Sequence, residues 1–185
     1  MRILLKFVID CDVDAAWRAL HSPRAVAELY GPLLHVQPLL DAEFPSSWEP
    51  GADAGVQLSL GGLVPMGRQL ISVSDREVTD EHGEVWIFRD SGMPLTGPLA
   101  GLDVWDHQMA VSSAPGDPSR TLWRDRLVIR GGIAPLLWPA LWATWQWREA
   151  RVKALAPSWA HDPEPGPGAA QPGVDPSADS AAPPA

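Results

Sequence analysis

The sequence predicts an α+β protein in which about seven antiparallel strands pack against one long C-terminal helix, with two short helices after the first strand. Three observations predict it. An apolar, β-branched run opens the chain, short strand-like runs separated by turn residues fill its middle, and an apolar stripe at helical spacing closes it. Strands joined by such short turns pair with their sequence neighbours, so we expect an antiparallel meander.

The opening segment, residues 2–9, has the composition of a strand. Its residues are large, apolar and often β-branched, and they alternate between two faces. Lys6 and Asp10 interrupt the apolar run and no small-residue cleavage site follows, which favours a strand over a signal peptide. The side chains expected on one face are Ile3, Leu5, Phe7 and Ile9.

Two short helices are expected next. Asp12 or Asp14 offers an N-cap for a helix that runs through Leu20. Ser22, followed by a proline suited to a first helical turn, starts a second helix that runs to about Tyr30. A Gly-Pro pair then ends it.

The rest of the folded chain is predicted as six strands and a terminal helix. Gly- and Pro-containing turns separate the strands. The terminal helix begins at Pro135 and reaches about Leu155, ending before Pro157, because proline disfavours a helical residue in front of it. The expected strands are 35–40, 54–60, 67–78, 84–90, 102–112 and 120–129.

Composition excludes several classes of function. The net charge of −9 and the pI near 4.9 argue against nucleic acid and anionic membranes as partners. The single cysteine, Cys11, cannot form an internal disulfide, and a reducing cytoplasm fits best.

No histidine or carboxylate set has metal-ligand spacing and no glycine motif cradles phosphate, so no metal or other cofactor is expected. The stretch 133–147 is broken by prolines and too short to span a membrane.

The domain organisation follows from a change in composition near residue 160. Residues 161–185 are almost entirely Pro, Gly, Ala, Ser and Asp. Such a segment cannot bury enough apolar surface to offset the entropy lost on ordering. We therefore expect one folded domain over residues 1–160 and a disordered acidic tail over 161–185.

Four short motifs accompany this order of elements. They are Phe7-Val8-Ile9 leading to Val13-Asp14-Ala15-Ala16-Trp17, Ser22-Pro23, Glu49-Pro50-Gly51-Ala52, and Arg124-Asp125-Arg126-Leu127. Over residues 2–158 the chain resembles the helix-grip fold of START domains, Bet v 1-like proteins and polyketide cyclases, and in detail the bacterial SRPBCC proteins. The resemblance implies a curved sheet around the terminal helix, enclosing a cavity that the superfamily uses for lipids, polyketides and other hydrophobic compounds. It supplies no catalytic motif.

Strand alternation places two polar residues in that expected cavity. If the more apolar faces look inward, His107 and Asp125 both enter it. A histidine oriented by a carboxylate would act as a general base or bind a ligand's polar end; alternatively, the two are a satisfied polar pair. The residues expected to line the cavity are Phe7, Trp86, Phe88, Trp105, His107, Met109, Trp123, Asp125, Leu137, Leu141 and Trp145.

Two further residues have alternative interpretations. Arg89 and Asp90 lie on opposite faces of one strand. Whichever face of that strand is turned inward, one of the two charges either enters the cavity or lies at the strand end. An inward Arg89 would bind a ligand carboxylate, whereas an outward one is an ordinary surface arginine. Cys11 precedes a helix start, which would lower its pKa, although a lone cysteine there is more often inert.

The terminal helix is unusually rich in tryptophan. Trp138, Trp142, Trp145 and Trp147 cannot all share one face of a helix with 3.6 residues per turn. The outward ones either form a docking surface, for instance for a homodimer, or pack on the two short helices. Trp147, beside polar neighbours, is expected to be the most exposed.

These features predict binding of a small hydrophobic ligand in an internal cavity, without a defined catalytic activity. Two alternatives remain open. One is an enzyme of the polyketide cyclase or dehydratase kind, a lyase or isomerase with His107 and Asp125 as acid and base. The other is a structural or interaction protein that acts through the tryptophan-rich helix.

Overall fold

The computed structural model describes residues 1–39, 44–80 and 83–161. Seven strands form one antiparallel sheet in the order β1-β8-β7-β5-β4-β3-β2, and the short strand β6 pairs with β4. The elements along the chain are β1 (Arg2–Ile9), α1 (Val13–His21), α2 (Pro23–Tyr30), β2 (Leu34–Pro38), β3 (Asp53–Leu60), β4 (Val64–Asp80), β5 (Gly83–Asp90), β6 (Met93–Pro94), the 3₁₀ helix η1 (Pro98–Gly101), β7 (Val104–Ala114), β8 (Asp117–Arg130) and α3 (Ala134–Trp159).

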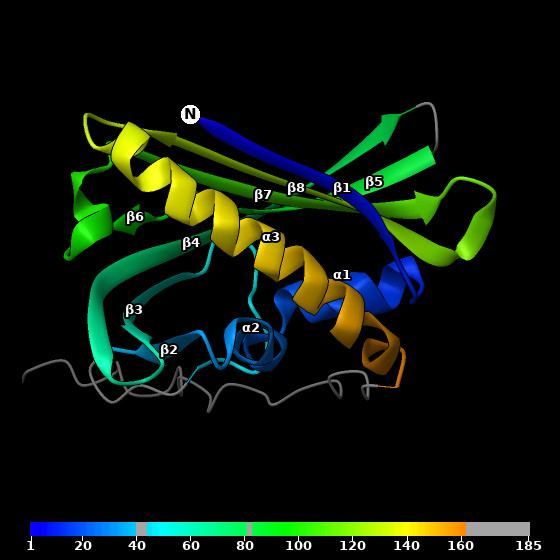
Figure 1. Ribbon diagram of the computed structural model, residues 1–185. Coiled ribbons are helices and arrows are strands. Elements are labelled where there is room, and N and C mark those ends of the chain that lie inside the picture. The colour runs from blue at the N-terminus through cyan, green and yellow to red at the C-terminus, as the bar shows by residue number, and fades with distance from the viewer. Residues whose placement is uncertain (40–43, 81–82, 162–185) are drawn as a thin grey trace, which may run out of the picture.

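The sheet is strongly curved and α3 crosses its concave side (Figure 1). The two short helices α1 and α2 lie beneath the C-terminal half of α3, while β2, β3 and the first part of β4 curl round on the other side (Figure 1). This arrangement confirms the predicted helix-grip fold. The space between the curled strands, α2 and α3 is where a ligand site is expected.

The two short helices form for the predicted local reasons. The Asp12 side chain accepts a hydrogen bond of 2.7 Å from the backbone N–H of Ala15, capping α1. The Ser22 hydroxyl accepts one of 3.2 Å from the N–H of Ala25, capping α2, and Pro23 occupies its first turn. Their boundaries agree with the prediction to within a residue or two.

The prediction that α3 ends before Pro157 is wrong, since the helix continues to Trp159. Trp159 is only 3% exposed, and its ring lies 6.1 Å from that of Trp123 in the sheet. Burial of so large an apolar side chain outweighs the hydrogen bond that the proline cannot donate.

Several strands differ from their predicted bounds. β4 and β8 are longer than expected, β7 keeps its predicted length but is shifted two residues toward the C-terminus, and β2 begins one residue earlier. Leu40, the predicted end of β2, lies outside the described residues. β6 and η1 were not predicted. They depend on a close backbone approach at Gly67, where a Cβ would come within 2.1 Å of the Thr96 carbonyl oxygen, and only glycine tolerates this together with its φ of +119°.

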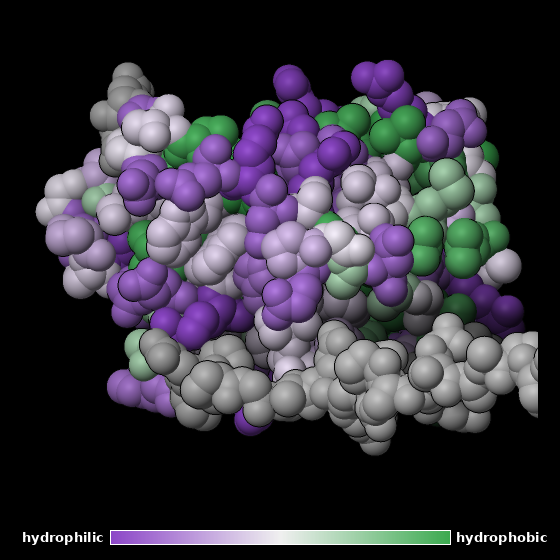
Figure 2. Space-filling model, turned by 180° about the vertical axis from the view of Figure 1, so that it is seen from behind, coloured by the Kyte–Doolittle hydropathy of each residue, from purple (hydrophilic) through white to green (hydrophobic). Residues whose placement is uncertain are grey.

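The surface also bears on function. Seen from behind, hydrophilic side chains cover much of the visible face of the sheet (Figure 2). Ion pairs join strands of the sheet, such as Arg126 of β8 to Asp106 of the neighbouring β7 at 3.2 Å, and Arg124 of β8 to Asp80 of β4 at 3.1 Å. Among the described residues no helix is long and apolar enough to cross a membrane. The predicted tail lies almost entirely outside the described residues.

Candidate functional site

A cavity of about 310 Å³ lies between the curled strands, α2 and the first half of α3. This volume is at the lower end of the range of about 300–1,000 Å³ typical of small-molecule sites. Most of its wall is apolar, with Leu29 from α2, Leu58 from β3 and Leu141 from α3 among the contributors. The few polar side chains that reach the cavity therefore determine what it can recognise.

Asp125 on β8 anchors a buried polar cluster behind one wall of the cavity. Its carboxylate is 1% exposed and accepts hydrogen bonds from His107 Nε2 at 2.9 Å and from Trp145 Nε1 at 2.8 Å. Arg148 Nη1 donates to its second oxygen. The donors come from β7 and α3, so the cluster joins the sheet to the helix. A buried carboxylate with three donors is fully satisfied.

Arg148, 3% exposed, is held on every side. Besides its bond to Asp125, it donates from Nε to the Tyr30 hydroxyl at 3.2 Å and from Nη2 to the Met109 sulfur at 2.9 Å. Its guanidinium carbon lies 5.7 Å from the ring centre of Tyr30 and 5.9 Å from that of Trp123. The cation is thus paired and enclosed by aromatic rings.

His107 is neutral in this environment. Burial, and next the charge of Arg148, lower the pKa of its imidazole from 6.5 to about 3. Because a carboxylate can only accept, we assign the ring proton to Nε2, which faces Asp125. Nδ1 then carries a free lone pair, and no described residue donates to it. The ring lines the cavity, so this nitrogen is available as an acceptor.

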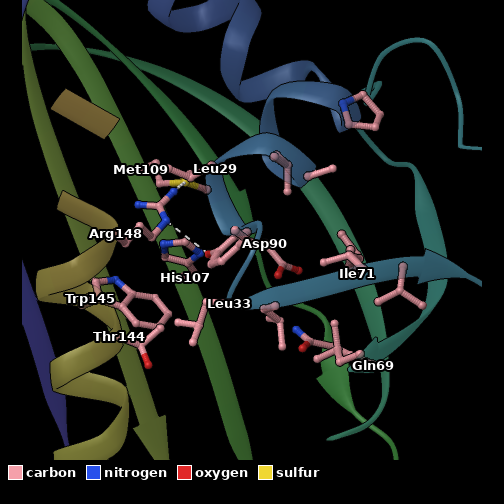
Figure 3. Close-up of a pocket in the computed structure, with 18 of the residues that line it drawn as sticks. Leu29, Leu33, Gln69, Ile71, Asp90, His107, Met109, Thr144, Trp145 and Arg148 are labelled. Carbon is pink, nitrogen blue, oxygen red and sulfur yellow. Dashed lines mark hydrogen bonds between the residues drawn. The ribbon is translucent and has the colours of Figure 1, made fainter. Parts of the chain in front are cut away.

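Asp90 lies directly across from His107 in the β5–β7 pair, and both side chains line the cavity (Figure 3). Its Oδ1 accepts hydrogen bonds from the backbone N–H groups of Ser72 at 3.1 Å and Gly92 at 3.0 Å. Burial raises the pKa of this carboxyl. The Trp105 indole N–H interacts with the carboxyl and opposes the rise in its pKa, but it makes no hydrogen bond of normal geometry. Oδ2 is therefore a second acceptor beside His107.

Gln69 on β4 adds an uncharged polar group. Its side chain lines the cavity (Figure 3) and is only 7% exposed, yet its amide makes no hydrogen bond to the described residues. Thr144 on α3 also lines the cavity, but its hydroxyl already donates to the Ala140 carbonyl oxygen at 2.9 Å. The Gln69 amide therefore faces the cavity with its hydrogen-bonding capacity unused by the described residues.

The structure brings most of the predicted cavity residues together. Phe7 lies instead in the core, stacked on Trp123 at 6.4 Å, and Trp86 packs against Trp17 at 5.7 Å. Asp125 is hidden behind Trp145 and His107 and does not reach the cavity. The predicted residues that do line it are Phe88, Trp105, His107, Met109, Trp123, Leu137, Leu141 and Trp145.

The structure also decides between the alternatives at two other positions. Arg89 points outward and pairs with Asp106 at 2.6 Å, so the inward charge of that strand is Asp90. Cys11 is buried, and burial together with the neighbouring Asp12 raises the pKa of its thiol to about 12. The helix start does not lower that pKa, so Cys11 is not an activated thiol.

The exposure of the tryptophans of α3 differs from the prediction. Trp142 is 46% exposed, whereas Trp147 is half-buried, so the expectation for Trp147 is wrong. Trp147 lies one turn from Arg151, which donates to the Glu28 carbonyl oxygen of α2, and so belongs to the side of α3 that faces α2. The homodimer expected through this helix stays a prediction, and Trp142 is the tryptophan that it would cover.

Sequence reasoning did not assign Arg148 or Gln69 to the site, and it left open whether Arg89 or Asp90 faces the cavity. A signal for Arg148 was present, since it lies three residues after Trp145 on the apolar stripe of α3, where an arginine needs a buried partner. Gln69 gave no such signal.

Within residues 1–39, 44–80 and 83–161, no group of three or more His, Cys, Asp or Glu side chains is placed to hold a metal ion.

No family model and no curated protein matches the sequence. Solved structures do match its architecture. A protein from Chromobacterium violaceum is 17% identical, with coverage of 84% of this chain and 96% of that one and a TM-score of 0.55. A protein from Arthrobacter aurescens is 14% identical, with 87% of both chains covered and a TM-score of 0.58.

A third structure defines the type of fold. Ara h 8.0201, a Bet v 1-like protein, is 13% identical to this chain; 88% of this chain and 99% of that one are covered, with a TM-score of 0.52. The fold is Bet v 1-like. In this Bet v 1-like fold, the cavity described above lies between the curved sheet and the long helix.

Proposed function

We propose that the protein binds a small, largely apolar molecule in the cavity, with the polar end of that molecule against His107, Asp90 and Gln69. The observation that carries the proposal is a cavity with an apolar wall and a few buried polar groups whose hydrogen-bonding capacity is unused. This combination is typical of small-molecule sites. The resemblance to SRPBCC proteins and the Bet v 1-like fold support the same proposal.

The energetic argument has two parts. An apolar ligand body gains about 25 cal/mol for each Å² of apolar surface removed from water. A polar end that bonds to Gln69 or to His107 Nδ1 gains a hydrogen bond, and each such bond contributes about 0.5–1.5 kcal/mol net. The first contribution favours any apolar molecule, while the second selects one with a polar group at the right end.

Native mass spectrometry of protein purified from its own host, followed by organic extraction, tests the proposal. We expect a stoichiometric compound with an apolar body and a polar end. Protein that is folded and empty, and that also takes up no apolar compound when these are offered, would overturn the proposal.

The pairing of His107 with Asp125 supports a second candidate, an enzyme of the cyclase or dehydratase kind. In it, the lone pair of His107 Nδ1 takes a proton from a bound substrate while Asp125 stabilises the resulting imidazolium. The low pKa of His107 makes it a weak base, which favours the binding role. The extracted compound distinguishes the two: turnover of it, lost in a folded His107→Gln variant, would establish the enzyme.

A further inference from the structure

We infer that the cavity prefers apolar molecules whose polar end donates hydrogen bonds, an amine or a hydroxyl, over apolar carboxylates. The inference rests on the proposed function and concerns the chemistry of the ligand's polar end. It follows from the charges and the unused acceptors at the cavity wall.

The only permanent cation among the described residues that line the cavity is Arg148. Each of its three nitrogens already has a partner, in Asp125, Tyr30 and Met109. Its charge is opposed by the Asp125 carboxylate, which lies behind the wall where a ligand cannot reach it. A ligand carboxylate therefore finds no free cation to bind.

The only carboxyl among the same lining residues is Asp90. No basic side chain of the described residues pairs with it, and backbone N–H groups hold its Oδ1. The Trp105 indole N–H interacts with this carboxyl but makes no hydrogen bond of normal geometry, so Oδ2 can still accept from a ligand. A ligand ammonium or hydroxyl would meet an acceptor there, and an ammonium would oppose the burial that raises the pKa of Asp90, whereas a ligand carboxylate would raise that pKa further.

His107 extends this acceptor surface. It is the cross-strand neighbour of Asp90, so their side chains lie side by side on the inner face of the sheet. Its Nε2–H is used by Asp125, which leaves the Nδ1 lone pair for the ligand. The Gln69 amide and the Tyr30 and Thr144 hydroxyls are uncharged and can accept from a ligand donor. The indole N–H groups of Trp105, Trp123 and Trp159 have no acceptor, but protein atoms cover these nitrogens, so they do not offer a ligand carboxylate an accessible donor.

Four probes with one apolar body and different polar ends test the inference by isothermal titration calorimetry at pH 7.5. They are 4-phenylbenzylamine, 4-biphenylmethanol, biphenyl-4-carboxylic acid and 4-methylbiphenyl. We expect the amine and the alcohol to bind at least tenfold more tightly than the acid. The methyl compound reports binding of the apolar body alone and should fall between them.

The variant Asp90→Asn removes the charge while keeping the oxygen that accepts from Ser72 and Gly92. It should reduce the preference for the amine over the acid at least fivefold and leave the affinity for 4-methylbiphenyl unchanged. Asp53→Asn, which alters an exposed carboxylate of β3 that does not line the cavity, is the matched control and should keep the preference.

The outcomes separate the two proposals. If 4-methylbiphenyl binds but the acid binds as tightly as the amine and the alcohol, or more tightly, the inference is wrong and the proposed function stands. If none of the four binds to the folded protein, both fail. If the preference is found but Asp90→Asn retains it in full, the assignment to Asp90 is overturned.

Discussion

Asp125 on β8 and Arg148 on α3 form an ion pair that is almost completely removed from solvent, with side chains 0% and 3% exposed. The pair joins the sheet to the helix that covers it. It also positions His107, which donates to the same carboxylate, and thereby turns the free nitrogen of that ring toward the cavity. The ligand site therefore depends on Asp125, a buried carboxylate that a ligand does not touch.

Breaking this pair from one side should strongly destabilise the protein. Arg148→Met leaves the Asp125 carboxylate buried without its cation, and removing one partner of a buried pair typically costs about 3–5 kcal/mol. Urea unfolding followed by circular dichroism measures the loss. Asp10→Asn, which breaks the exposed pair with Arg120, is the control and should change the free energy of unfolding by less than about 1 kcal/mol.

Replacing both partners should cost less than the sum of the single changes. In Asp125→Leu with Arg148→Met, no uncompensated charge remains in the core, so part of the loss should be recovered. The same unfolding measurement on the two single variants and the double variant gives the coupling free energy. Strict additivity would show that the two residues do not act as a pair.

Stability should fall in acid because of His107. Its pKa is about 3 when folded and about 6.5 when unfolded, so between these values the unfolded chain binds a proton that the folded protein does not. The free energy of unfolding should therefore decrease as the pH drops below about 6.5, by up to about 1.4 kcal/mol per pH unit, and be unaffected by this group above that pH.

Urea unfolding between pH 5 and 8 checks this prediction. In His107→Gln the slope between pH 5 and 6.5 should be shallower, whereas His35→Gln, at an exposed position of β2, should keep the slope of the unmodified protein. An identical slope in the His107 variant would mean that this imidazole is not kept neutral by burial.

Closing the cavity mouth should abolish binding without unfolding the protein. Ala140 of α3 is exposed and also lines the cavity, which places it at the opening. Ala140→Trp should weaken binding of 4-methylbiphenyl at least tenfold in calorimetry. Ala150→Trp adds the same side chain to an exposed position of α3 away from the cavity and should bind normally. Equal affinities in the two variants would place the ligand elsewhere.

The last turn of α3 should contribute substantially to stability despite Pro157. Trp159 is buried against Trp123, and truncation of a buried tryptophan to alanine typically costs about 3–5 kcal/mol. Leu136→Ala, at an 81% exposed position of the same helix, should cost less than about 0.5 kcal/mol. A Trp159→Ala variant as stable as the Leu136 variant would show that the helix does not extend past Pro157.

The sequence was sufficient for the order of elements because each depends on local chemistry. Ser22 and Asp12 cap helices through atoms only three residues away, and the inward face of β7 follows from simple alternation. The continuation of α3 to Trp159 could not be predicted in this way. It depends on burial of Trp159 against the Trp123 ring of β8, which overrides the local signal of Pro157.

The site was predictable only in part for the same reason. Alternation placed His107 and Asp125 on inward faces, and the structure joins them at 2.9 Å. Whether each reaches the cavity depends on what covers it. Asp125 is covered by Trp145 and Arg148 of α3, which lie 20 and 23 residues further along the chain. Gln69 reaches the cavity only because the sheet curls, a property of the whole sheet rather than of its own strand.

Nuclear magnetic resonance of the histidine ring nitrogens tests the central claim most directly, with 4-biphenylmethanol added to the ¹⁵N-labelled protein. The account predicts a one-to-one complex in which the Nδ1 resonance of His107 shifts in the direction of an accepted hydrogen bond, while exposed His35 is unaffected. A saturable complex that leaves His107 unchanged, or no complex at all, would contradict it.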